Sequence, residues 1–143
     1  MEIIIAIVVG TIIWFVLRGK KAISETKTGL ASNSVSYTYN IVGEQSYQDS
    51  LNKIAGPKEE DSKFFECYAK VSSELFNQYD KNAVKVESNG LLVGYLSRSE
   101  AAKLAGKVVN KTVPAVIDGG WDDGSSVGSY GVKLAISNAS DLL

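Results

Sequence analysis

The chain of 143 residues contains no histidine and a single cysteine, Cys67. One cysteine cannot form a disulfide within the chain, and without histidine no zinc site is credible. The commonest general base is also missing, because histidine is the side chain that titrates near neutral pH. A lone cysteine in a β-rich segment is most often a small core residue and suits a reducing compartment. These absences argue against a metal centre and a disulfide framework.

Catalytic motifs are also missing. The pattern G-x-x-x-x-G-K-S/T of phosphate-binding loops does not occur, which excludes nucleotide hydrolysis of that kind. Asp118, Asp122 and Asp123 lie among glycines, but their spacing matches no calcium loop, and a solvated hairpin tip explains them better. We therefore expect a protein that is not an enzyme by itself, with no cofactor and no bound metal.

Charged residues are absent between Ile3 and Leu17, where most positions are Ile, Val, Leu, Phe or Trp. A helix of about 15 residues spans about 22 Å, somewhat less than the ~30 Å hydrocarbon core, and flanking aromatic and basic side chains extend its reach. Arg18, Lys20 and Lys21 follow the run, whereas only Glu2 precedes it. Because basic flanks stay in the cytoplasm, we expect residues 1–21 to be a single-pass inner-membrane anchor, with its N-terminus out and the domain in the cytoplasm.

Two alternatives exist for this segment. A cleaved secretory signal has a hydrophobic region of this length, but its basic residues precede that region. A buried core helix would show a polar face, which continuous Ile and Val do not provide. Residues 22–33 then turn polar, with Ser, Thr, Gly and Lys, and predict a flexible linker.

The remaining residues, 34–143, are enough for one packed domain and show short strand patterns separated by turns. Alternation and β-branched content predict strands over Ser34–Val42, Phe64–Val71, Ala83–Glu87, Leu91–Leu96, Val113–Ile117 and Gly131–Ile136. In the first of these, Val35, Tyr37, Tyr39 and Ile41 should share one face. Asp118–Ser129, rich in Gly, Asp and Ser, predicts a long hairpin loop that carries Trp121.

Two short helices complete the pattern. One is expected over Tyr47–Ala55, ended by Gly56 and Pro57. The other should begin after Ser97 or Ser99 and bury one face, made of Ala101, Leu104, Ala105 and Val108. Few helices and many short strands predict a mainly β fold, either a small barrel or a strongly curled sheet.

The central unit runs from Tyr79 to Ala105. Asn89 and Gly90 tolerate positive φ, which makes this pair the strongest short-range signal for a tight hairpin. Gly94 lies inside the return strand and predicts a bulge or a close backbone approach. Before the hairpin, residues 79–82 form a polar turn.

This order of elements resembles the HIRAN family, small β-rich modules that occur alone in bacteria and phages or fused to helicases and nucleases. The residues that carry the resemblance are Tyr79-Asp80-x-Asn82-Ala83-Val84-x-Val86, Gly90-x-x-Val93-Gly94-Tyr95-Leu96, Ala101 and Leu104-Ala105, with further matches at 40–47 and at 119–134. The resemblance implies an OB-like or SH3-like β-barrel over residues 34–143, which would follow the single transmembrane helix that the apolar run over residues 3–17 predicts.

Members of the family in eukaryotes capture the 3′ end of single-stranded DNA, and the resemblance implies the same partner here. The matched residues would be Tyr79 and Asp80 in the pocket, Tyr47 as a stacking ring and Arg98 as a phosphate contact. We add Lys81, one of several basic residues in or near this unit, and Tyr95, which lies in the matched return strand. This hypothesis makes the chain a membrane-tethered nucleic-acid-binding module.

The same residues have structural interpretations. Asp80 and Asn82 could cap a turn by bonding their own backbone, and Tyr79 could be a core residue. DNA-end-binding relatives carry an arginine and an aromatic where this chain has Gln45 and Ser46. Outside residues 1–21 the chain has 12 basic and 15 acidic residues, whereas nucleic-acid binders are usually basic. The alternative function is a membrane-anchored protein-interaction or scaffold module that uses an exposed face and the Trp121 loop.

Overall fold

The computed structural model describes residues 35–143, and Ser36–Leu143 form one compact unit. The anchor expected over residues 1–21 and the linker expected over 22–33 lie outside the described residues. Within 35–143, no helix is long and apolar enough to cross a bilayer.

The described part is mainly β, as the sequence predicts. Its six strands are β1 (Tyr39–Asn40), β2 (Lys63–Ser73), β3 (Val84–Ser88), β4 (Leu91–Tyr95), β5 (Asn110–Gly119) and β6 (Tyr130–Leu134). The helical elements are the 3₁₀ turns η2 (Glu44–Tyr47) and η3 (Ala139–Leu142) and the short helices α2 (Gln48–Ala55) and α3 (Arg98–Ala102).

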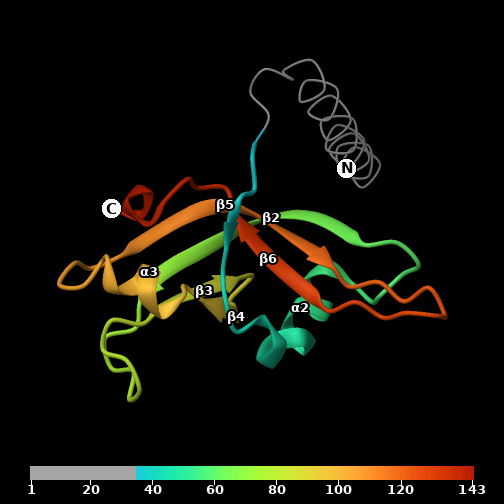
Figure 1. The fold of residues 1–143 in the computed structure, drawn as a ribbon, viewed down its shortest axis with the longest axis horizontal. Helices are drawn as coiled ribbons and strands as arrows, with labels where there is room; N and C mark the ends of the chain where they lie inside the picture. The colour runs from blue at the N-terminus through green and yellow to red at the C-terminus, as the bar shows by residue number, and fades with distance from the viewer. Residues whose placement is uncertain (1–34) are drawn as a thin grey trace, which may run out of the picture. The chain divides into compact units, whose positions relative to one another are not determined.

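All strand pairs are antiparallel and form one sheet in the order β1-β6-β5-β2-β3-β4. The segment that contains β1 contacts both edges of this sheet: Tyr39 pairs with Leu134 of β6, and Val42 bridges Tyr95 of β4. The sheet is therefore curled into a half-barrel, with β2 and β5 as its two long strands (Figure 1).

The core lies inside this curl. Alternate side chains of β2, β3 and β5 point inward, and Ala69, Val71, Val86 and Ala115 are fully buried. Leu51 of α2 and Leu104 after α3 are buried in the same core. Burying several aliphatic side chains at about 1.5–3 kcal/mol each supplies the main stabilisation of a domain this size.

The central hairpin forms as predicted. Asn89 and Gly90 both have positive φ, at 52° and 75°, and connect β3 to β4. The register shifts between Val86 and Glu87, so β4 carries a bulge next to Gly94. A Cβ on Gly94 would lie 2.7 Å from the Val42 carbonyl oxygen, so the close backbone approach is confirmed as well.

Helix α2 covers part of the edge of β6. The Gln48 side chain accepts from the Tyr130 amide at 2.8 Å and donates to the Tyr130 carbonyl at 3.0 Å. It therefore makes the two backbone hydrogen bonds that a neighbouring strand would otherwise make. The Tyr130 hydroxyl donates to the Gly56 carbonyl at 2.6 Å, which fixes the end of α2.

Two local predictions are wrong. The strand expected over Ser34–Val42 is reduced to Tyr39–Asn40, and Val35 is half exposed, because no strand among the described residues pairs with 35–38. The buried face expected after Ser97 holds for Ala101 and Leu104 only. Helix α3 ends at Ala102 and Gly106 turns the chain at φ 80°, so Ala105 and Val108 are exposed and Val109 is buried instead.

Candidate functional site

A hollow of about 700 Å³ opens beside the loop that joins β2 to β3. We call it the aromatic hollow. Four segments line it: the chain around Val42 and Tyr47, residues 74–83, the end of β4, and the start of α3. Five of the six candidate residues are among the lining: Tyr47, Tyr79, Asp80, Tyr95 and Arg98.

Lys81 is the exception. It lines a separate hollow of about 640 Å³, together with Leu75, Lys107 and Val108, on a different side of the same loop. Lys81 is exposed, so it contributes positive charge near the aromatic hollow without lining it.

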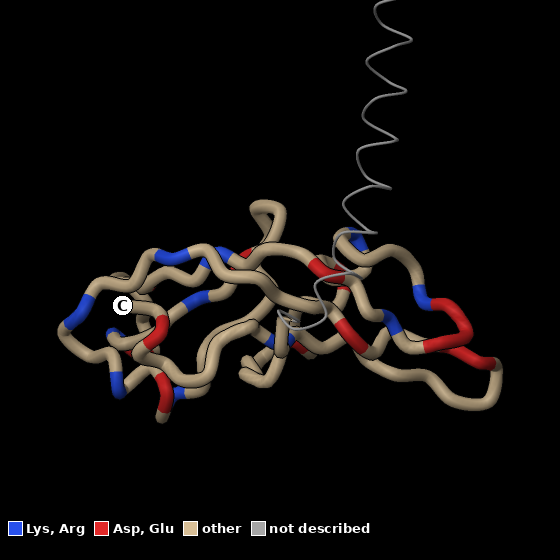
Figure 2. The backbone as a smooth tube through the Cα atoms, turned by 90° about the horizontal axis from the view of Figure 1, so that it is seen from above, with Lys and Arg blue, Asp and Glu red and all other residues tan. Residues whose placement is uncertain are grey.

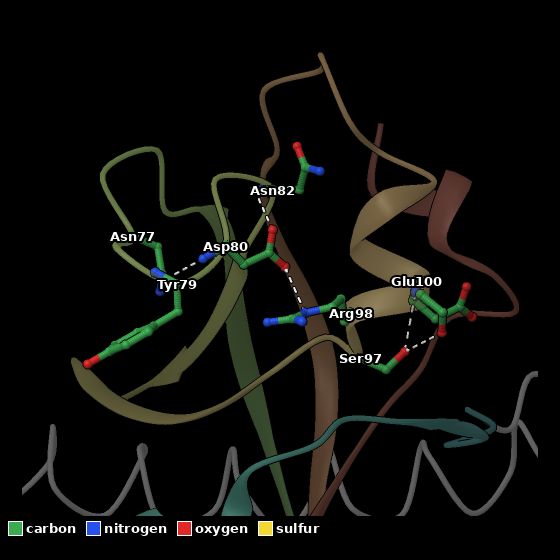
Figure 3. A network of polar contacts seen from close by, with 8 residues as sticks. Asn77, Tyr79, Asp80, Asn82, Ser97, Arg98 and Glu100 are labelled. Atoms are coloured by element: carbon green, nitrogen blue, oxygen red, sulfur yellow. Dashed lines mark hydrogen bonds and ion pairs between the residues drawn. The ribbon is translucent and has the colours of Figure 1, made fainter.

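The β2–β3 loop is held by the side chain of Asn77. Its Oδ1 accepts from the backbone amides of Tyr79 and Asp80, each at 2.9 Å (Figure 3). Its Nδ2 donates to Glu74 Oε1 at 2.7 Å. Asparagine favours such turns because its short amide reaches nearby backbone groups. Asn77 thus fixes the backbone positions from which Tyr79 and Asp80 project.

Asp80 has two roles that use different oxygens. Its Oδ1 accepts from the Asn82 amide at 2.9 Å, the turn-capping bond that the structural interpretation predicts. Its Oδ2 lies 3.8 Å from Arg98 Nε, and the two side chains face each other in Figure 3. The Asp80 side chain is 21% exposed and that of Arg98 is 79% exposed, so the pair is weak and screened by solvent.

Tyr79 is not a core residue. It is 88% exposed, and its ring projects from the loop into open space (Figure 3). The interpretation of Tyr79 as core is therefore wrong, because the Asn77 turn holds residues 77–80 away from the sheet.

The inner wall of the hollow holds a part-buried polar contact. The Tyr95 hydroxyl donates to Glu74 at 3.3 Å to Oε1 and 3.2 Å to Oε2. Burial, the charge of Glu74 and its hydrogen bond raise the pKa of Tyr95 to about 12, with a smaller effect from nearby Tyr47. The Tyr95 phenol therefore stays protonated and the Glu74 carboxylate has an internal donor.

The lining residues that the sequence did not predict include Glu74, Phe76 and Asn77. Phe76 is 95% exposed, and Tyr79 in the same loop is 88% exposed, so the loop presents two aromatic rings to solvent. The signal was present, since Leu75 and Phe76 are apolar residues inside a polar, turn-forming stretch.

Charge is unevenly distributed along the domain. Figure 2 shows more basic residues toward the end where the C-terminus lies and more acidic residues toward the other end, with some residues of the opposite sign at each. Near the hollow, Lys85 pairs with Glu87 at 3.2 Å and Lys103 pairs with Glu100 at 2.5 Å, so part of the positive charge is neutralised. Over residues 35–143 no group of three or more metal-ligating side chains is brought together.

Comparison with known proteins identifies no relative: no family model matches the chain, and neither a curated protein nor a solved structure matches it.

Proposed function

We propose that the chain is a nucleic-acid-binding module whose aromatic hollow receives a single-stranded DNA end with a free 3′ hydroxyl. The observation that carries this proposal is the juxtaposition of Asp80 and Arg98 beside exposed aromatic rings in one hollow. The resemblance of residues 34–136 to HIRAN modules supports the same partner.

Aromatic rings supply the first part of the binding energy. Phe76 and Tyr79 are almost fully exposed beside the hollow, and Tyr47 lies on its other wall. An aromatic side chain that stacks on a base contributes about 1–3 kcal/mol and is tolerant of sequence. Phe76 therefore offers a stacking surface in a chain that has Gln45 and Ser46 where end-binding relatives carry an arginine and an aromatic.

The Asp80–Arg98 pair supplies discrimination. Asp80 Oδ2 can accept a hydrogen bond from a terminal hydroxyl, whereas an internal phosphodiester would be repelled by the carboxylate. Arg98 is exposed and only weakly paired, so it can turn toward the last phosphate while Asp80 keeps its turn bond to Asn82. One carboxylate and one arginine thus distinguish a strand end from its interior.

The test measures binding of labelled oligothymidylate by the full chain in a non-ionic detergent, using fluorescence anisotropy at modest salt. We expect a free 3′ hydroxyl to bind more tightly than a 3′ phosphate, and Asp80→Ala to remove this difference. Because few phosphates are contacted, the salt dependence should be shallow, with a slope of about −0.7 per phosphate. The control is Asp118→Ala, which removes a carboxylate paired with Lys133 at 3.2 Å that does not line the hollow.

Equal binding of free and blocked ends would refute end recognition. Absence of any nucleic-acid affinity would favour the second candidate, a membrane-tethered protein-interaction module. Its support is the exposed face of β2, where Phe64 is 69% and Tyr68 70% exposed. Trp121 does not add to that surface, because its ring packs over Gly128 and its Nε1 donates to Ser126 at 3.2 Å.

A further inference from the structure

Strand β2 is longer than one of its two neighbours. It pairs with β5 from Lys63 to Ser72 but with β3 only from Lys70 to Ser73. Residues 64–68 therefore have a strand on one side and, among residues 35–143, no strand on the other. We call these residues the open edge of β2.

The hydrogen-bond pattern shows which backbone groups face this edge. The Ser73 amide donates to Val109, on the β5 side, and the Glu74 amide donates to Ala83, on the β3 side. Since bonding alternates along a strand, even-numbered residues of β2 point their N–H and C=O groups away from β5. Phe64 and Glu66 thus present both groups to the open edge, and Tyr68 presents its N–H, while its carbonyl accepts from Ser88 Oγ at 2.9 Å.

The side chains at the edge are incompletely covered on both faces. Phe64 and Tyr68 are exposed on the outer face. On the inner face Ala69 and Val71 are fully buried, but Phe65 is 38% exposed and Cys67 is only half-buried. The core of the half-barrel therefore thins out toward the start of β2, where one more strand would cover Phe65 and Cys67.

We propose that the open edge of β2 accepts an extended segment of a partner protein as an additional strand, with apolar side chains facing inward and basic side chains facing outward. Main-chain bonds to Phe64, Glu66 and Tyr68 would give affinity, and alternate side chains would give specificity, as in other strand additions. This proposal concerns a different surface from the aromatic hollow and does not depend on nucleic-acid binding.

The charge of the surroundings selects a basic segment. Glu66 lies at the centre of the open edge of β2. Its carboxylate accepts a hydrogen bond from the Tyr37 hydroxyl, which carries no positive charge and so does not neutralise it. Glu59, Glu60 and Asp61 precede β2, and the bridge between Glu59 and Trp121 brings Asp122 and Asp123 beside them, which makes this the acidic end of the domain. Lys63 pairs with Glu59 at 2.8 Å. Among the described residues, no ion pair involves Glu60, Asp61, Asp122 or Asp123.

The same negative charge disfavours two other occupants of the open edge, a second copy of the chain and a nucleic-acid strand. In a second copy paired across a two-fold axis centred on the edge, Glu66 would lie opposite Glu66 and the two acidic ends would meet. A nucleic-acid strand would be repelled by the same carboxylates.

The probe is a labelled, acetylated nonapeptide of alternating lysine and valine, titrated against the full chain in non-ionic detergent. Glu66→Pro removes an edge N–H that the β2–β5 ladder does not use, so the strand should keep its fold. We expect it to weaken peptide binding by about tenfold or more. Glu66→Ala is the matched control, because it removes the same carboxylate and the same Tyr37 contact but keeps the N–H; its loss should be smaller.

A second measurement does not require a folded variant. Peptides methylated on all lysine amide nitrogens or on all valine amide nitrogens present opposite backbone edges, so one of the two should bind the wild-type chain and the other should not. Asp80→Ala should bind the peptide as the wild type does. Equal binding of both methylated peptides, equal binding of an alternating glutamate and valine peptide, or full binding by Glu66→Pro with native circular dichroism would overturn the proposal. So would a wild-type dimer in sedimentation that Glu66→Pro dissociates, because the occupant would then be a second copy.

Discussion

The Tyr95 hydroxyl donates to both carboxylate oxygens of Glu74, which joins the end of β4 to the residue that directly follows β2. Glu74 also accepts from Asn77, and Asn77 holds the amides of Tyr79 and Asp80. The wall and the rim of the aromatic hollow are therefore one connected hydrogen-bond network. Such a network positions groups more rigidly than isolated contacts do, because each member restricts the next.

The first prediction concerns alkaline pH. The folded pKa of Tyr95 is about 12, above the ordinary value of 10, so the neutral phenol contributes stability that is present below pH 10 and is lost as the pH rises toward 12. Tyrosinate absorbance near 295 nm should show that Tyr95→Phe removes one late-titrating group. Tyr39, whose pKa is also raised to about 12 by burial and by the charge of Glu100, should remain.

The variant Glu74→Gln tests whether the Glu74 carboxylate contributes to the raised pKa of Tyr95. Removing the carboxylate charge while keeping a similar shape should lower the pKa of Tyr95, since that charge is the second cause after burial. A late titration that is identical in the wild type and in Tyr95→Phe would show that the contact is absent in solution.

The second prediction concerns Gly94. A Cβ there would lie 2.7 Å from the Val42 carbonyl and 2.8 Å from Ile41 Cδ1, and the first of these atoms is backbone and cannot move cheaply. Gly94→Ala should lower the free energy of unfolding by about 1–3 kcal/mol, as overpacked sites do. Urea denaturation measures this, and an unchanged midpoint would mean that the segment around Val42 does not close on β4.

The sequence predicted correctly the features that residues close together in the chain determine, and it failed where distant contacts decide. The hairpin at Asn89 and Gly90 was predictable because two adjacent residues determine its turn, and the strands around it follow from alternation. The length of β1 was not predictable, because it depends on which distant strand has a free edge at that point. The chain after α3 was not predictable either, because it continues in turns to Gly106, whose positive φ breaks the helical spacing that Ala105 and Val108 suggested.

The candidate site shows the same division. Tyr79 and Asp80 were chosen with Arg98 from the resemblance, and all three line one hollow. Lys81 is one of several basic residues in or near the central unit, yet adjacent residues of a turn point in different directions, and it lines the other hollow. Asn77 could not be identified in advance, because its role consists of backbone bonds that exist only in the folded loop.

The third prediction concerns Cys67. Burial raises the pKa of its thiol, partly offset by a hydrogen bond with Ser88, so little thiolate is present near neutral pH. Iodoacetamide at pH 8 should modify it more slowly in the folded chain than in urea, as measured by intact mass. Because Cys67 lies on the inner face of the open edge of β2, the lysine and valine peptide should slow modification further. A folded chain that reacts as fast as the unfolded one would contradict the half-buried position.

The last prediction distinguishes the two proposed surfaces by replacing one exposed aromatic residue at each with alanine. Phe76 is 95% exposed and Tyr68 is 70% exposed, so replacing either by alanine should change the free energy of unfolding little, within about 0.5 kcal/mol. If a base stacks on Phe76, Phe76→Ala should weaken oligothymidylate binding by about 1–3 kcal/mol and leave peptide binding unchanged. Tyr68→Ala should leave oligothymidylate binding unchanged, because Tyr68 lies on the outer face of β2 and does not line the hollow. Anisotropy titrations of both variants with both probes test this. Similar loss of DNA binding in the two variants would indicate nonspecific adsorption to exposed rings, and the hollow would then have no special role.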